Sequence, residues 1–303
     1  MIYLIASIFL SAGVASALKI AGIKKLDSDN VTLYNYIFAV SFSLLNCLRS
    51  NHLHLMKNLP KADFTTLLSE PNLGNSAFLT LFFGVILGLA YLGIVVSMKY
   101  SIRNNGAGIT SFFSKTGFIL TTVFSIIVWH EIPGLLQWLG IIVAVIALLL
   151  MMSNTGEKGN IHAPHFLLLV VLCNSIIEIN KKFFTIYAMS DFQDLLVLVI
   201  FTVALIACIF YNFGRKRKAG VRFRIKGYEI LLGVFMGLPN VLSSIVQLLG
   251  LQHLPATVFF PSSAAGSLVF NILVGRFIFK ETLSKKQVLA VIVAMTSLVL
   301  INI

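Results

Sequence analysis

Residues 106–152 read GAGITSFFSKTGFILTTVFSIIVWHEIPGLLQWLGIIVAVIALLLMM, an apolar stretch that contains one lysine. Residues 256–302 repeat its pattern at an offset of 150 residues. The aligned pairs include Glu131 with Glu281, Gln137 with Gln287, and Lys115 with Ala265. This self-similarity predicts that the chain contains two copies of one structural unit, and the positions at which the copies differ indicate where function lies.

The composition predicts a membrane protein. The chain has 303 residues, of which 58% are hydrophobic and only 11% are charged, and its mean hydropathy is +0.93. Such a chain has too little polar surface to cover a water-soluble domain, and a membrane helix needs about 20 apolar residues. We expect an all-α membrane protein with ten transmembrane helices near residues 2–22, 31–48, 77–98, 106–129, 133–153, 164–187, 192–212, 229–250, 256–279 and 285–302.

The ten helices form two halves, residues 1–155 and 156–303, within a single membrane domain. Toward the start of each half the offset is 162, and Lys19 aligns with Lys181. Because five is an odd number, the second half enters the membrane from the opposite side, so the repeats are inverted. Inverted repeats are typical of carriers that open alternately to either side of a site near the bilayer midplane.

Two GxxxG pairs occupy equivalent places in the third helix of each half. They are Gly84 with Gly88 and Gly233 with Gly237. Small residues at this spacing let two helix backbones approach closely in lipid. We therefore expect both pairs to mark close helix packing.

The chain resembles the EamA-type carriers of the drug/metabolite transporter superfamily. The resemblance rests on SIIVWHEIPGLLQWLGIIVAVIALLL and GRFIFKETLSKKQVLAVIVAMTSLVLI, in which a glutamate, a short turn and a glutamine open the last helix of each half. It implies a ten-helix carrier and leaves the substrate open. Carriers of this kind export amino acids and drugs or exchange sugar phosphates and nucleotide sugars.

The basic residues are distributed unequally between the two sides of the membrane. Loops on the N-terminal side carry Arg49, Lys57 and Lys61. Those on the other side carry Lys24, Lys25, Lys99, Arg103, Lys158, the basic residues from Arg215 to Lys226, Lys280, Lys285 and Lys286. The positive-inside rule then places both termini outside the cytoplasm, whereas many relatives have both inside. We expect a multi-pass protein of a bacterial plasma (inner) membrane.

The basic segment from Arg215 to Lys226 is interpreted mainly as a signal for topology. A lipid-phosphate patch is the alternative. Since this segment and its neighbours explain most of the net charge of +12, the charge does not indicate a nucleic-acid partner.

Lys115 lies near the middle of the fourth helix, where an ionised group is costly and usually has a function. Its helical neighbours include Ser111 and Phe112, which would give it a hydroxyl and a ring. A lysine suits a carboxylate or a phosphate. The alternative is a lysine paired with a carboxylate for structure.

The sixth helix carries a polar stripe with Asn174, Glu178, Lys181 and Lys182. Glu178 is interpreted as a proton-coupling carboxylate or a partner of Lys115, or as an acid neutralised by Lys181 or Lys182 one turn on. For Lys182 both a functional role and a structural role at the helix end stay open. Further candidates for a cavity, each with an interhelical hydrogen bond as the alternative, are Tyr36, Tyr91, Asn240, Gln247 and Ser262.

The function class follows from what the sequence contains and lacks. A membrane-embedded enzyme is the distant alternative, but no HExxH, GxSxG or similar motif is present. No motif indicates a metal or cofactor, and Cys47, Cys173 and Cys208 all lie in apolar runs. We expect a secondary transporter of a small anionic or zwitterionic metabolite, with a coupling proton or counter-substrate, or else an exporter of cationic or amphipathic compounds.

Overall fold

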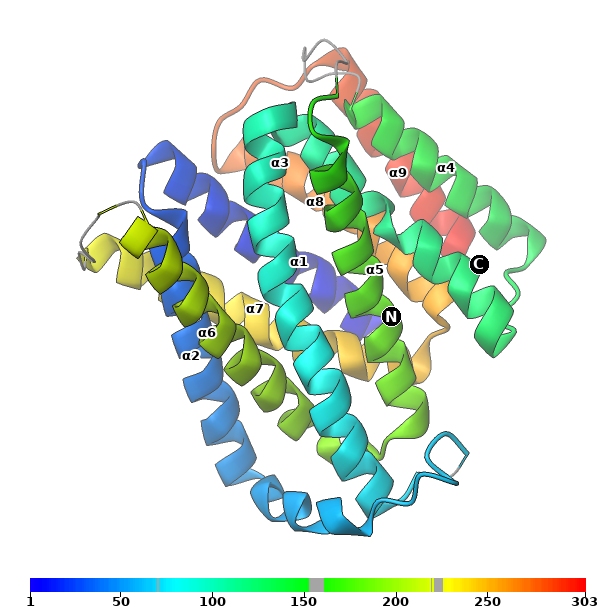
Figure 1. The fold of residues 1–303 in the computed structure, drawn as a ribbon. Helices are drawn as coiled ribbons and strands as arrows, with labels where there is room; N and C mark the ends of the chain where they lie inside the picture. The colour runs from blue at the N-terminus through cyan, green and yellow to red at the C-terminus, as the bar shows by residue number, and fades with distance from the viewer. Residues whose placement is uncertain (70, 153–160, 219, 221–225) are drawn as a thin grey trace. The chain divides into compact units, whose positions relative to one another are not determined.

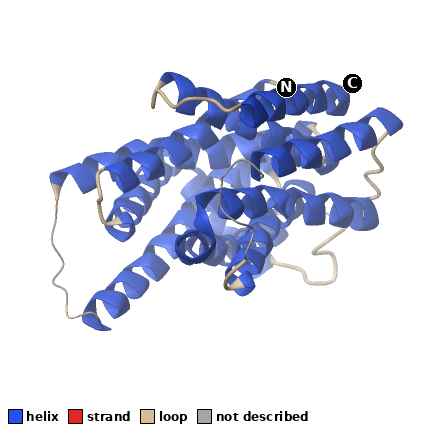
Figure 2. Cartoon of the chain, turned by 90° about the horizontal axis from the view of Figure 1, so that it is seen from above, coloured by secondary structure: helices blue, strands red, loops and turns tan. Residues whose placement is uncertain are grey.

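The computed structural model describes residues 1–69, 71–152, 161–218, 220 and 226–303, and every regular element in these ranges is helical (Figures 1 and 2). The elements are α1 (Ile2–Ile23), α2 (Ser28–Arg49), η1 (His52–Lys61), α3 (Leu73–Trp129), α4 (Leu135–Met152), α5 (Pro164–Tyr187), η2 (Ser190–Phe192), α6 (Gln193–Lys218), α7 (Gly227–His253), α8 (Ala256–Phe277) and α9 (Lys285–Asn302).

Helix α3 consists of two helical segments joined at Gly106. This residue has φ 82° and ψ 164°, a conformation that glycine adopts without the steric cost of a Cβ. The break gives two candidate membrane spans, Leu73–Gly106 and Gly108–Trp129. The first segment continues eight residues beyond the expected end at residue 98.

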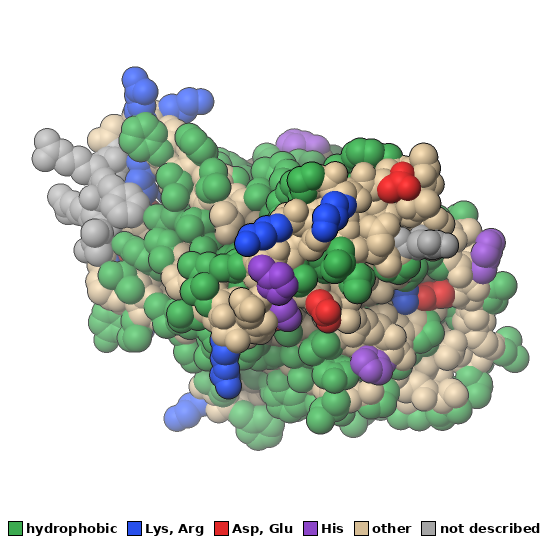
Figure 3. Space-filling view, turned by 90° about the horizontal axis from the view of Figure 1, so that it is seen from below, with side chains coloured by type: hydrophobic (Ala, Val, Ile, Leu, Met, Phe, Trp, Pro, Cys, Tyr) green, Lys and Arg blue, Asp and Glu red, His purple; other side chains and the backbone are tan. Residues whose placement is uncertain are grey.

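Nine helices of the described residues are long and apolar enough to cross a membrane. Helix α5 has the expected bounds but is not one of the nine, and it carries Glu178, Lys181 and Lys182. The tenth crossing therefore stays a prediction. Large hydrophobic side chains are exposed on most of the helices, and Figure 3 shows them covering much of one face. Such a surface is typical of contact with lipid.

The helices form two compact units, which we call the first and the second unit. The first comprises Met1–Ala12, Gly93–Lys182 and Leu249–Ile303, and the second comprises Gly13–Leu92 and Phe183–Leu248. The first unit contains the fourth and fifth helices of each expected half, and the second contains the second and third. The expected boundary between the halves, at residue 155, lies outside the described residues.

In the second unit, both GxxxG pairs lie at close helix contacts, as predicted. A Cβ at Gly88 of α3 would lie 2.7 Å from the carbonyl oxygen of Ile200 in α6. A Cβ at Gly237 of α7 would lie 3.0 Å from the carbonyl oxygen of Asn35 in α2. The third helix of each half therefore packs on the second helix of the other half. A two-fold relation would produce this reciprocity, and the inversion itself stays a prediction.

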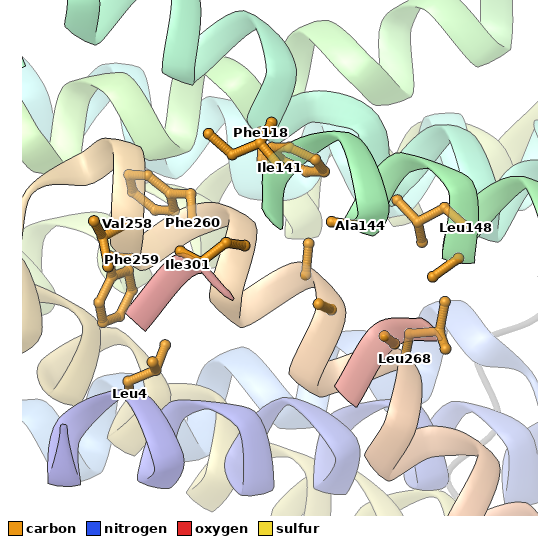
Figure 4. Packing of buried hydrophobic residues seen from close by; sticks show 14 of the residues in the cluster. Leu4, Phe118, Ile141, Ala144, Leu148, Val258, Phe259, Phe260, Leu268 and Ile301 are labelled. Atoms are coloured by element: carbon orange, nitrogen blue, oxygen red, sulfur yellow. The ribbon is translucent and has the colours of Figure 1, made fainter. Parts of the chain in front are cut away.

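A hydrophobic core cluster of the first unit is built mainly from α4, α8 and α9 (Figure 4). Phe118 enters it from α3, and Phe259 and Phe260 enter it from α8. Helices α4 and α9 approach closely, because a Cβ at Gly140 would lie 2.8 Å from the backbone nitrogen of Ile301. The cluster holds the fourth and fifth helices of both halves in one body.

The same turn ends the fourth helix of each half. His130 has φ 52° and Lys280 has φ 55°, and a left-handed residue is a common way to end a helix. The amide of Glu131 donates to the carbonyl six residues earlier, at 3.3 Å, and the amide of Glu281 does the same at 3.1 Å. The repeat seen in the sequence thus has a local structural counterpart at this turn.

The fifth helices also begin alike. The side-chain oxygen of Gln137 accepts the amide of Gly134 at 3.0 Å, and that of Gln287 accepts the amide of Ser284 at 2.9 Å. Ser284 completes a capping box, since its hydroxyl accepts the amide of Gln287. These bonds satisfy amides that a helix start leaves unpaired, so the aligned glutamines have a structural role.

The basic segment from Arg215 to Lys226 was expected in a loop, but its first residues lie in a helix. Helix α6 continues to Lys218, and Arg215 forms ion pairs with Asp27, at 3.4 Å, and with Asp29. Lys216 is also buried, and its Nζ lies 3.8 Å from Oδ2 of Asp27. The buried carboxylate of Asp29 at the start of α2 needs a cationic partner, and cations favour a helix C-terminus. Arg222, Arg224 and Lys158 lie outside the described residues.

Candidate functional site

The site centres on a close contact between α5 and the second segment of α3, both in the first unit. A Cβ at Gly117 would lie 2.9 Å from the Cβ of Asn174, so a larger residue would push the helices apart. The hydroxyl of Ser175 donates to the carbonyl of Gly117 at 2.9 Å. Glycine and serine at a helix contact let two backbones approach and bond in an apolar setting.

Lys115 and Glu178 lie in this contact region and act on one another electrostatically. The hydroxyl of Thr121 donates to Oε2 of Glu178 at 2.7 Å. The charge of Lys181 also acts on Glu178. We call Lys115, Glu178, Lys181 and Thr121 the charged cluster. Of the partners expected for Glu178, the structure therefore places both Lys115 and Lys181 within its electrostatic reach.

The side chains of Lys115 and Glu178 are only half-buried, whereas Lys181 is fully buried. Asn174 adds an amide beside them, which donates to Ser114 Oγ at 3.2 Å and to the carbonyl of Val170 at 3.1 Å. The arrangement offers an ammonium, a carboxylate and an amide from one helix pair. These are groups that can bind a small charged molecule.

Ser111 and Phe112, the expected neighbours of Lys115, have different surroundings. Ser111 is exposed. Phe112 packs against the hydrophobic core cluster and makes an edge contact with Phe113, with ring centroids 5.3 Å apart. The described contacts of Phe112 thus place its ring in packing.

Lys182 has a separate partner. Its Nζ lies 2.8 Å from Oε1 of Glu131, and both side chains are largely buried. Oε2 of Glu131 accepts the amides of Ala256, at 2.7 Å, and Thr257, at 3.4 Å. One carboxylate therefore caps the start of α8 and neutralises a lysine of α5. This contact ties three segments of the first unit together.

Tyr36 and Tyr91 belong to the second unit, where they hydrogen-bond between helices. The hydroxyl of the buried Tyr36 donates to the carbonyl of Tyr91 at 3.1 Å. The hydroxyl of Tyr91 pairs with that of Ser244 at 2.7 Å. These contacts fit the packing alternative.

Three further candidates also have protein partners. Asn240 donates to Oδ1 of Asn35 at 3.1 Å, and Gln247 donates to Ser243 on its own helix at 3.0 Å, both in the second unit. Ser262, in the first unit, is buried and accepts the amide of Asn302 at 3.0 Å. The bonds of Asn240 and Ser262 join different helices, and interhelical polar bonds of this kind stabilise helix packing in lipid.

Sequence reasoning missed Thr121 and Ser114 as members of the site. A signal for them exists, because Ser114, Gly117 and Thr121 recur at spacings of three and four and so share one helix face. Among the described residues, no group of three or more His, Cys, Asp or Glu side chains is arranged to hold a metal ion.

Comparison with known proteins indicates a family for the chain. The model of the EamA-like transporter family matches residues 1–153, about half of the chain. A comparison with curated proteins found no match. One solved structure, described only as the crystal structure of a protein, is similar with a TM-score of 0.73 and 12% identity, over 99% of this chain and 94% of that one. At that identity the likeness concerns the fold alone.

The family is one of membrane transporters of small compounds, and the long apolar helices make the chain an integral multi-pass membrane protein. The chain belongs to the EamA-like transporter family.

Proposed function

We propose that the protein is a secondary carrier that moves a small anionic or zwitterionic metabolite by alternating access. In this proposal Lys115 contacts the carboxylate or phosphate of the substrate. The supporting observation is the charged cluster itself, which lies on two apolar helices and whose Lys115 and Glu178 are half-buried. An ionised group in such a place is costly, and those that remain usually face a cavity and act there.

The balance of charge within the cluster favours an anion. Two of its three charged groups, Lys115 and Lys181, are cationic, and Glu178 is the single carboxylate. Lys182 is neutralised by Glu131. A substrate that brings a negative charge balances the ammonium groups, and an amine on the same substrate suits Glu178. This pairing is the reason for proposing an anionic or zwitterionic compound.

Export of a cationic or amphipathic compound is the second candidate. It is favoured by an apolar crevice of ≈ 410 Å³ on the same two helices, lined by residues that include Phe113, Leu120 and Leu167. In that case Glu178 receives the cation, and Lys115 tunes the charge of Glu178. The two candidates make opposite predictions for a lysine variant.

The test is uptake into liposomes that contain the purified protein. The panel contains amino acids, carboxylates and phosphate esters on one side, and cationic amphiphiles on the other. We expect wild-type protein to move an anionic or zwitterionic compound, and Lys115→Gln to lose that uptake. Lys57→Gln, which neutralises an exposed lysine of η1, is the matched control and is expected to behave as wild type. Transport of cations alone, unchanged in Lys115→Gln, would refute the proposal.

Coupling to protons is proposed at Glu178, because a carboxylate on an apolar membrane helix is a group that can take up and release a proton. The Glu178→Gln variant removes this capacity and keeps the size of the side chain. We expect it to abolish uptake driven by a pH gradient while exchange of labelled for unlabelled substrate persists. Gradient-driven uptake at the wild-type rate would rule out this role.

The orientation is proposed from charge, with both termini outside the cytoplasm. Arg215 and Lys216 belong to that count although they are ion-paired with carboxylates. A reporter that matures only in the cytoplasm, fused after Ile303, should therefore stay inactive. A fluorescent C-terminal fusion would contradict this orientation and would place both termini in the cytoplasm.

A further inference from the structure

An apolar crevice with a cationic rim lies in the second unit, where α1 ends and α7 begins. Its volume is ≈ 330 Å³. The residues that line it include Ile20, Lys24, Leu26, Tyr228, Leu231 and Phe235. Beneath it lies a small core cluster that contains Ala17, Ala21 and Leu232. The crevice therefore has a packed apolar floor, and among the described residues that line it Lys24 carries the charge.

Three of the lining residues from α7 are exposed at the surface of the protein. Tyr228 is 61% exposed, Leu231 65% and Phe235 55%. An apolar surface of this kind in a membrane protein contacts acyl chains. The crevice is therefore suited to the hydrocarbon part of a lipid.

The rim of the crevice is positively charged. Lys24 lies over the ring of Tyr228, with its Nζ 4.1 Å from the ring centroid, a contact that holds an ammonium in place without neutralising it. Lys25 is exposed beside it. The nearby acid Glu229 is buried and accepts hydrogen bonds from Asn30 and from the amide of Asp27. It therefore does not lie at the exposed rim.

We infer that this crevice binds a phospholipid with an anionic headgroup, whose phosphate meets Lys24 and whose acyl chain lies along Leu231 and Phe235. The charge of the rim and the apolar floor match the two parts of such a lipid. Basic pockets at the ends of membrane helices bind anionic headgroups, and each cation near the surface contributes about 1 kcal/mol. The loss of one lysine should therefore weaken binding about fivefold.

The test measures how lipids bind to and stabilise the purified full-length protein in detergent. The probes are phosphatidylglycerol, phosphatidylcholine and inorganic phosphate, with binding followed by native mass spectrometry and stability by thermal unfolding. We expect phosphatidylglycerol to bind and to raise the unfolding temperature more than phosphatidylcholine does. Inorganic phosphate should produce no shift.

Matched variants assign the effect to the crevice. Lys24→Gln should bind phosphatidylglycerol about fivefold more weakly, whereas Lys285→Gln, which neutralises an exposed lysine at the start of α9, should bind it as wild type does. Leu231→Trp keeps the charge but fills the crevice, and it should also weaken binding. This second variant keeps the test decisive if Lys24→Gln folds poorly.

Three results would overturn the inference. They are equal binding of both lipids, equal losses in Lys24→Gln and Lys285→Gln, and a shift of the same size with inorganic phosphate alone. The last would indicate a site for a free anion.

Discussion

Replacing Glu131 by glutamine should destabilise the first unit by about 3 kcal/mol. The change removes the charge that faces Lys182 Nζ at 2.8 Å, while the side chains of Lys182 and Glu131 are only 8% and 17% exposed. Removing one partner of a buried pair typically costs about 3–5 kcal/mol, because the other charge stays buried. We take the lower end, since the glutamine oxygen can still accept the amide of Ala256.

Two further variants divide this cost into its parts. Glu131→Ala also removes the cap of α8 and should cost about 1 kcal/mol more. Lys182→Met should cost less than Glu131→Gln, because Glu131 keeps the amides of Ala256 and Thr257 as donors. In a double-mutant cycle the pair Glu131→Gln and Lys182→Met should show a coupling of about 1.5–3 kcal/mol.

The assay is equilibrium unfolding of the purified protein in mixed detergent, with helicity followed by circular dichroism. The control is Glu281→Gln, because Glu281 aligns with Glu131 but its side chain is exposed. Exposed pairs contribute about 0–1 kcal/mol, so the control should stay close to wild type. Equal destabilisation by the two glutamine variants, or strict additivity in the cycle, would show that the ion pair between Glu131 and Lys182 does not stabilise the first unit.

Two more predictions concern packing and the start of α2, and the same unfolding measurement checks both. Gly117→Ala should destabilise the protein by about 1–3 kcal/mol through overpacking. The control is Gly214→Ala, where an added Cβ meets nothing within 4 Å, and it should stabilise the protein by up to about 1 kcal/mol. Equal effects of the two variants would contradict the close contact at Gly117. Arg215→Gln should destabilise the protein more than Arg217→Gln, because Arg215 binds the buried Asp29 and Arg217 is exposed. The reverse order would show that the ion pair between Arg215 and Asp29 does not contribute to stability.

The helices could be predicted from the sequence because length and hydropathy decide them. Each expected span coincides with a helix, and the bounds of α5 and α9 agree to the residue. The ends of α6 and of the first segment of α3 could not be predicted. Lys216 looks like a loop residue until Asp27, which is distant in the sequence, supplies a carboxylate partner, and the local sequence pattern does not contain that contact.

The site was predictable in part for the same reason. A charge in an apolar helix indicates function by its cost alone, so Lys115 and Glu178 stand out in the sequence. Their neighbours depend on which helices meet. Lys182 and Glu131 are 51 residues apart and show no relation in the sequence, yet they form an ion pair. Thr121 is an ordinary helix residue until Glu178 lies opposite it.

In the proposed mechanism, Lys115 holds the negative charge of a transported compound. The most direct measurement is the KM for uptake of the anionic or zwitterionic substrate found in the panel, in wild type, Lys115→Gln and Lys115→Arg. A lost charged hydrogen bond corresponds to about 1.5–3 kcal/mol, or roughly 10- to 100-fold. We predict that Lys115→Gln raises the KM by that factor and that Lys115→Arg, which keeps the charge, recovers part of it. A wild-type KM in Lys115→Gln would show that Lys115 does not bind the negative charge of the substrate.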